Sequence, residues 1–283
     1  MKDNNKRVFE YMSMYLNYAP HFITPELMEN TGGDETAFAA LIAALCMLDT
    51  VNDPDDKELY RDYFIPAVHK LDPADFEEDE YYKEIKLPKI KQNGWELTYL
   101  TCKAYEGFVC GDPVTVPDGR IIPQIGYFER DFTYPAVLQD GREWMTLLPN
   151  EMITTKPHVV KAHGKVLTFG LGLGYFAFCA ANKINVSSVT VVERDGAVID
   201  LFKTHILPQM RCKDKIRVIQ SDAFEYAEMQ MAAEKYDFAF TDIWHDPSDG
   251  VDPYLKMKRY EKYSPQTDFT YWIEDTLKLY IRS

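Results

Sequence analysis

Three glycines at alternate positions, Gly170, Gly172 and Gly174, stand between the apolar run VLTF and an apolar helical pattern. Glycine lets a backbone turn tightly and approach a ligand closely, because no Cβ stands in the way. Glu193 ends the next apolar run, nineteen positions after Gly174, where a carboxylate can accept both ribose hydroxyls of a nucleoside. Together they predict a nucleotide-binding site. The alternatives are a tight turn without ligand and a surface acid at a strand end.

The spacing of this loop favours a mononucleoside over a dinucleotide. The dinucleotide fingerprint G-x-G-x-x-G needs a glycine at its sixth position, where this chain has Tyr175. Close packing of a pyrophosphate against the start of the helix is therefore disfavoured, and NAD ranks below a mononucleoside ligand.

Two later segments carry further candidate side chains. Asp222 and Ala223 follow an apolar run, and the carboxylate can read the exocyclic amine of an adenine; capping of a helix is the alternative. Asp242, His245 and Asp246 come after the next run and are the candidates for chemistry. We expect Asp242 to act as a base, with His245 second. An acidic loop that caps the following helix is the other interpretation.

The elements that position these residues alternate from Lys165 to Asp246 between strand-like and helix-like patterns. Such alternation predicts an α/β fold of the Rossmann-like type, with a parallel sheet whose ligands bind beyond the carboxyl ends of the strands. After Asp246 only helical patterns are expected. The sheet is thus expected to be shortened, lacking the usual last strands, with the preceding hairpins or a partner subunit covering the edge.

The preceding part of the chain is divided by pattern into two segments. Residues 1–105 show apolar residues at helical spacing and are expected to be helical. In residues 106–150, the turn signals P-D-G at 117–119 and Asp140-Gly141 lie between short β-type runs and predict hairpins. Residues 151–283 then form the Rossmann-like domain.

Composition excludes several classes of partner. A net charge of −14 leaves no excess of basic residues for a nucleic-acid backbone, and no apolar run has the length of a membrane span. The five cysteines are scattered without zinc-like spacing, so no metal is expected. Without a signal-peptide pattern, a cytoplasmic protein with a small-molecule substrate is expected, and a homodimer is left open.

The stretch from Asp140 to Pro247, a little over a third of the chain, resembles the spermidine synthase-like group of S-adenosylmethionine-dependent enzymes. Asp140-Gly141 is similar to that group's D-G hairpin, and Glu151-Met152 to its E-M element. The remaining matches, by position, are the glycine loop Gly170, Gly172 and Gly174, the ribose-binding acid Glu193, the adenine-binding pair Asp222-Ala223, and the proton-removing acid Asp242. The resemblance implies S-adenosylmethionine or its decarboxylated form as cofactor.

Departures from that group separate two reactions. Polyamine synthases have an aspartate in the glycine loop where this chain has Leu173, a tyrosine where it has Pro149, and a D-x-x-D-P loop one residue shorter. We therefore expect an S-adenosylmethionine-dependent methyltransferase that acts on a small amine, hydroxyl or carboxyl acceptor. Aminopropyl transfer and a non-catalytic nucleoside-binding module that contacts a protein partner are the alternatives.

Overall fold

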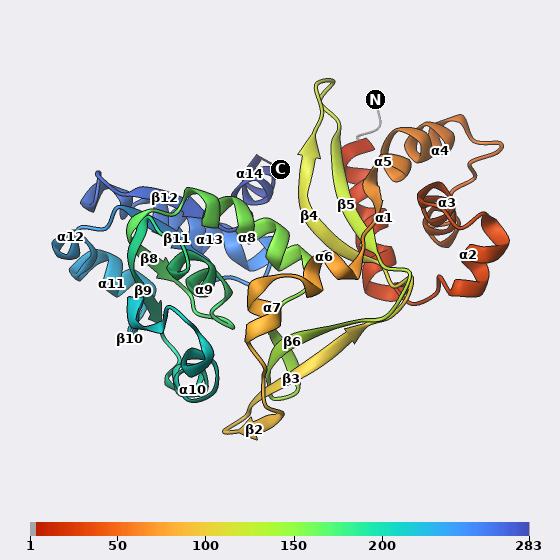
Figure 1. Cartoon of the computed structure of the whole chain (residues 1–283). Coiled ribbons are helices and arrows are strands. Elements are labelled where there is room, and N and C mark those ends of the chain that lie inside the picture. The colour runs from red at the N-terminus through yellow and green to blue at the C-terminus, as the bar shows by residue number, and fades with distance from the viewer. Residues whose placement is uncertain (1–3, 283) are drawn as a thin grey trace. The chain divides into compact units, whose positions relative to one another are not determined.

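The computed structural model describes residues 4–282, which form two compact units, each described by itself (Figure 1). The first unit comprises the residues up to Phe76 together with Thr101–Thr133. The second comprises Glu77–Leu100 and the chain from Tyr134 onward. Each unit is thus built from two separate stretches of the chain. Within the described residues, no helix is both long enough and apolar enough to cross a membrane.

The first unit packs helices against a small sheet. Its helices are α1 (Asn4–Tyr18), α2 (Pro25–Thr31), α3 (Glu35–Leu45), α4 (Pro54–Leu59), α5 (Ile65–Ala67) and α6 (Pro73–Glu77). Its strands are β1 (Val68–Lys70), β4 (Phe108–Thr115) and β5 (Ile121–Tyr127), in the order β1-β5-β4. The core joins both kinds of element, since the ring of Phe38 on α3 stacks on that of Tyr127 on β5 with centroids 4.1 Å apart.

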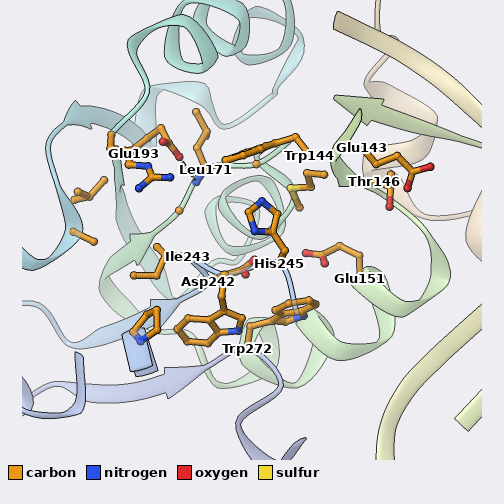
Figure 2. A pocket seen from close by; sticks show the side chains of 18 of the residues that line it. Glu143, Trp144, Thr146, Glu151, Leu171, Glu193, Asp242, Ile243, His245 and Trp272 are labelled. Carbon is orange, nitrogen blue, oxygen red and sulfur yellow. Dashed lines mark hydrogen bonds between the residues drawn. The ribbon is translucent and has the colours of Figure 1, made fainter. Parts of the chain in front are cut away.

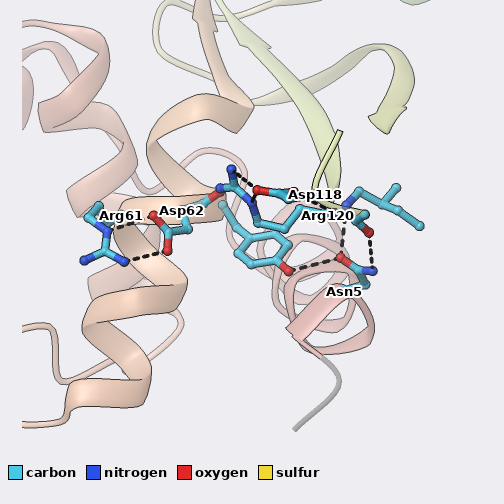
Figure 3. Close-up of polar contacts among 8 residues, drawn as sticks. Asn5, Arg61, Asp62, Asp118 and Arg120 are labelled. Atoms are coloured by element: carbon cyan, nitrogen blue, oxygen red, sulfur yellow. Dashed lines mark hydrogen bonds and ion pairs between the residues drawn. The ribbon is translucent and has the colours of Figure 1, made fainter. Parts of the chain in front are cut away.

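Polar contacts fix the turn of the β4–β5 hairpin to the helices of this unit (Figure 3). Asn5 donates from its amide to the Gly119 carbonyl oxygen at 3.2 Å, and its own carbonyl oxygen accepts from the Tyr63 hydroxyl at 3.1 Å. Arg120 donates to the Asp62 carbonyl oxygen at 2.7 Å and to the Asp118 carboxylate at 2.8 Å. The turn that P-D-G predicts is therefore present and held from both sides.

The second unit contains an antiparallel sheet of order β2-β3-β6-β7. Its strands are β2 (Ile90–Gln92), β3 (Trp95–Cys102), β6 (Phe132–Gln139) and β7 (Arg142–Thr146). The β6–β7 turn places Asp140 and Gly141 at φ values of 50° and 82°, as expected for a D-G hairpin. Asn93 and Gly94 make the same turn between β2 and β3. β6 and β7 lie in the part expected to form hairpins. β1, β2 and β3 lie in residues 1–105, which we expected to be helical, so that expectation is wrong for these three strands.

The larger sheet of the second unit has five strands, all parallel, in the order β10-β9-β8-β11-β12. They are β8 (Gly164–Phe169), β9 (Val186–Glu193), β10 (Ile216–Gln220), β11 (Phe238–Thr241) and β12 (Asp268–Tyr271). The apolar residues of β8, β9 and β11 are almost fully buried, as both faces of a parallel sheet require. The α/β class and the parallel, Rossmann-like sheet are therefore as expected.

Helices connect these strands and flank the sheet. They are α7 (Glu80–Glu84), α8 (Pro149–Lys161), α9 (Tyr175–Ala181), α10 (Gly196–Leu201), α11 (Ala223–Met229), α12 (Met231–Glu234), α13 (Pro247–Lys258) and α14 (Glu274–Arg282). Short π- or 3-10-helical turns add to the ends of several of them. The unit thus has the crossover helices that parallel strands need.

The fifth strand corrects the expectation that only helices follow Asp246. β12 pairs in parallel with β11 from Phe238–Asp268 to Thr241–Tyr271, so this chain itself covers the edge that we assigned to the hairpins or to a partner subunit. Only Tyr271 of the strand is fully buried, because β12 is an edge strand. Four residues without a continuous apolar run give no strand signal, and the aromatic residues that follow continue into α14.

Candidate active site

A cavity of about 450 Å³ lies within the second unit, at the carboxyl ends of the parallel strands (Figure 2). This is the edge at which an open parallel sheet binds its ligands, and the volume suits a nucleoside-sized molecule. Residues from β7, α8, the strand ends and the loop before α13 line it: Glu143, Trp144, Met145, Thr146, Leu148, Asn150, Glu151, Gly170, Leu171, Gly172, Val192, Glu193, Arg194, Ser221, Asp222, Ala223, Phe224, Asp242, Ile243, Trp244, His245, Pro253 and Trp272.

The glycine loop forms one wall of the cavity through Gly170 and Gly172, which have φ values of +97° and +49°. A Cβ on Gly170 would collide with the carbonyl oxygen of Asp242, and one on Gly172 with the Met145 sulfur. Side chains at these positions are excluded both by the backbone conformation and by the neighbours. Gly174 instead precedes α9, packs beside Phe202 and does not line the cavity.

Glu193, at the end of β9, faces the glycine loop. Its Oε2 accepts from the Leu171 N–H at 3.2 Å and its Oε1 from the Asp195 N–H at 2.9 Å. Each carboxylate oxygen can accept a second hydrogen bond, so Glu193 retains capacity for donors inside the cavity. The residue thus stiffens the loop and remains able to bind a hydroxyl-bearing ligand.

Asp222 caps a helix and also borders the cavity. Its Oδ1 accepts from the backbone N–H groups of Phe224 and Glu225 at 2.9 and 3.1 Å, which caps α11. Asp222 and Ala223 also line the cavity. Because both capping bonds use Oδ1, the cap orients the second oxygen without occupying it.

Asp242 and Glu151 form a pair of carboxyl groups that point towards one another at the cavity (Figure 2). Burial raises the pKa of Glu151 to about 7, although a hydrogen bond from the Thr155 hydroxyl at 3.3 Å opposes this rise. Burial and the neighbouring Glu151 raise the pKa of Asp242 well above its usual value. Ionisation of both buried carboxyl groups at once is unfavourable, so the pair holds a proton near neutral pH.

His245 reaches into the middle of the cavity, whereas Asp246 does not line it (Figure 2). The Nδ1 of His245 lies 2.9 Å from Oδ2 of Asp249, and the edge-on ring of Trp144 packs against it with centroids 4.6 Å apart. Asp246 is the N-cap of α13 and accepts from the Ser248 N–H at 2.6 Å. Structure therefore separates the three residues we grouped as catalytic: two lie at the cavity and the third caps a helix.

Three of the four tryptophans line the cavity: Trp144, Trp244 and Trp272. Trp272 donates from Nε1 to the Thr154 hydroxyl at 2.8 Å. Among the described residues the buried Trp244 Nε1 and Asn150 Oδ1 have no hydrogen-bond partner, although both residues border the cavity. Buried polar atoms without partners are rare, and a bound ligand or water can satisfy them.

Several residues at or near the cavity were not among the predicted site residues. Trp144 and Met145 belong to the β7 strand, whose hairpin is predictable but whose facing residues are not. Asp249 could have been found, since D-x-x-D at 246–249 is the capping-box pattern that the start of α13 adopts. The hydroxyls of Tyr175 and Tyr254 donate to Asp79 and Glu274.

No protein-family model and no curated protein matches this chain. Among solved structures, it is similar to one described as a candidate caffeoyl-CoA O-methyltransferase from Staphylococcus aureus, at 22% identity and a TM-score of 0.31, over 42% of this chain and 51% of that one. It is also similar to a precorrin 8w decarboxylase from Methanobacterium thermoautotrophicum, at 16% identity and a TM-score of 0.33, over 44% of this chain and 63% of that one. The chain thus covers less than two thirds of either structure, and at these TM-scores neither likeness assigns a function.

Proposed function

We propose that this protein is an S-adenosylmethionine-dependent methyltransferase acting on a small-molecule acceptor. The observation that carries the proposal is the position of Glu193, in contact with the Gly170–Gly172 loop and lining the same cavity at the carboxyl ends of a parallel sheet. The resemblance to the spermidine synthase-like group points to the same cofactor.

The residues of the cavity fit S-adenosylmethionine. Glu193 keeps acceptor capacity for the two ribose hydroxyls, and Asp222 is oriented by its cap to accept from the adenine amine. Trp244 Nε1 and Asn150 Oδ1 are buried beside the cavity without partners in the described chain, so they are a spare donor and a spare acceptor for the amino-acid end of the ligand.

In a bound state, S-adenosylmethionine supplies a methyl group on a positively charged sulfur. The protein mainly positions the two reactants, since displacement at a sulfonium needs alignment above all. The aromatic walls Trp144 and Trp272 offer π faces to a cation. A proton acceptor is needed in addition if the acceptor group must lose a proton. Asp242 and His245 are the two side chains placed to do so.

Aminopropyl transfer is the second candidate, because the Glu151–Asp242 pair beside aromatic rings suits an amine. Leu173 opposes it. Its side chain is fully buried and does not line the cavity, so the glycine loop offers no acid to a ligand amine.

Calorimetric titration with S-adenosylmethionine, its decarboxylated form and NAD tests the proposal. We expect S-adenosylmethionine to bind most tightly and Glu193→Ala to weaken it by about 100-fold, because two hydrogen bonds to a carboxylate together contribute about 3 kcal/mol. Glu193→Gln keeps one oxygen that can accept from the Leu171 N–H, and so tests the loss of the carboxylate with the contact to the loop retained. Glu225→Ala, which removes an exposed acid from nearby α11, is the matched control.

Three outcomes contradict the proposal in different ways. Preference for the decarboxylated form would favour aminopropyl transfer, and preference for NAD would overturn the mononucleoside interpretation. Undiminished affinity in both Glu193 variants would remove the observation on which the proposal rests. If an Asp242→Asn, His245→Gln double variant kept every activity of the wild type, a non-catalytic binding module would be favoured.

A further inference from the structure

We infer that, in the methyl transfer proposed above, His245 is the group that accepts the proton of the acceptor, and that Asp249 holds its ring in the tautomer that can do so. Asp242, which we expected in this role from its position in the sequence, then acts with Glu151 as a hydrogen-bonding pair. The inference rests on the proposed function for its reaction, and on the geometry of residues 242–249 for its residues.

The tautomer of His245 follows from its contact with Asp249. A carboxylate accepts hydrogen bonds and cannot donate, so at 2.9 Å the proton lies on Nδ1 of the ring and is donated to Oδ2. Nε2 is then left with a lone pair, as a proton acceptor requires. Burial raises the pKa of Asp249, but hydrogen bonds from the His245 ring and from the backbone of Asp246 and His245 outweigh it, and the pKa is lowered overall.

Asp249 is itself fixed by the backbone around it. Its Oδ1 accepts from the N–H groups of both His245 and Asp246 at 3.0 Å. Asp249 is the N3 residue of the capping box at the start of α13, in which Asp246 is the N-cap. The imidazole also packs in a T-shaped arrangement with the ring of Trp144. Two elements, α13 and β7, therefore determine where the imidazole lies.

Asp242 is poorly suited to accept a proton. It shares the cavity wall with Glu151, and the pair already holds a proton near neutral pH because both groups are desolvated. By contrast, the side chains of His245 and Asp249 are 47% and 46% exposed, so a proton taken up by the ring can leave to water.

The step balances as follows. A lone pair on the acceptor atom forms a bond to the methyl carbon while the carbon–sulfur bond breaks and leaves its electron pair on sulfur. The proton of the acceptor atom passes to Nε2 of His245. The positive charge of the sulfonium is thereby replaced by that of an imidazolium, which Asp249 stabilises.

The tautomer can be read without any acceptor, by long-range ¹H–¹⁵N NMR of the ¹⁵N-histidine-labelled full chain, with His245→Gln assigning the signal among the six histidines. We expect the neutral ring to carry its proton on Nδ1. In Asp249→Asn the amide oxygen still caps α13, while the amide nitrogen donates to the ring and moves the proton to Nε2. Asp246→Ala removes a cap from the same helix without touching the ring, and should leave the tautomer unchanged. A wild-type proton on Nε2, or an unchanged tautomer in Asp249→Asn, would overturn the inference.

The catalytic role is tested by transfer of radiolabelled methyl from S-adenosylmethionine to two probes, a phenol and an aromatic amine. With the probe that turns over, kcat/KM should rise with pH in the wild type, and His245→Gln should remove this rise. Asp249→Asn should lower kcat by about 10³ to 10⁴, as expected for a misplaced tautomer, with little change in the KM for S-adenosylmethionine. Asp242→Asn should keep the rise of kcat/KM with pH.

If the rise of kcat/KM with pH persisted in His245→Gln and disappeared in Asp242→Asn, the inference would be overturned in favour of Asp242. Failure of the proposed function looks different, since S-adenosylmethionine would then not bind or would transfer no methyl to any probe. The tautomer would still report on the His245–Asp249 contact.

Discussion

Replacing Glu151 by glutamine should make the second unit more stable at neutral pH than the wild type. In the native state burial raises the pKa of Glu151 from 4.5 to about 7, so folding favours the protonated form. Above pH 4.5 the unfolded chain ionises while the native protein keeps its proton, and stability falls as the pH rises to about 7. At about 1.4 kcal/mol per pH unit, this loss amounts to about 3 kcal/mol.

Glutamine removes this loss, because it cannot ionise and its carbonyl oxygen can still accept from Thr155. It also removes the charge that raises the pKa of Asp242. We expect Glu151→Gln to equal the wild type in stability near pH 4.5 and to exceed it by about 1 to 3 kcal/mol at pH 8.

Urea denaturation at both pH values measures the effect, followed by tryptophan fluorescence. All four tryptophans lie in the second unit, at 95, 144, 244 and 272, so fluorescence reports on the unit that contains Glu151. Glu225→Gln, an exposed acid on α11, is the control and should change stability at neither pH. Equal destabilisation of Glu151→Gln at pH 4.5 and pH 8 would refute the reasoning.

Two further substitutions test contacts around the glycine loop and the strand ends. Tyr81→Phe should lower the free energy of unfolding by about 1 to 3 kcal/mol in the same fluorescence assay, because it leaves the buried Leu173 carbonyl without the hydroxyl that donates to it at 2.6 Å; an unchanged midpoint would show that this contact is dispensable. Asp222→Ala should cost about 1 kcal/mol through loss of the α11 cap, whereas Asp222→Asn keeps the cap. If Asp222 reads adenine, calorimetry should show weaker S-adenosylmethionine binding in both variants; normal affinity in the asparagine variant would limit Asp222 to capping.

The strand ends could be predicted from sequence because their signals are local. Gly170 and Gly172 follow one buried strand, and Glu193 ends the next. Because the two strands are parallel, their carboxyl ends lie at the same edge of the sheet. The same reasoning places Asp222 and Asp242 at that edge. Their roles in binding and catalysis stay predictions.

The Glu151–Asp242 pair could not be predicted from the residues alone. The two lie on α8 and after β11, and only the packing of that helix beside the sheet makes each desolvate the other. The E-M resemblance singled out Glu151 but said nothing of its partner. Asp249 was not selected for a different reason. Four aspartates lie between residues 242 and 252, and their spacing alone does not distinguish them. The start of α13 determines which of them faces the imidazole.

The late position of β12 in the chain has a consequence for synthesis. β8 and β11 lie next to one another in the sheet, but the free edge of β11 stays open until Asp268–Tyr271 has been made. A nascent chain that stops between α13 and β12 would therefore expose a buried, apolar strand with unpaired backbone groups, which is a template for association with other chains. A chain truncated in this short interval should aggregate, whereas one that ends just after Tyr271 retains all five strands of the sheet.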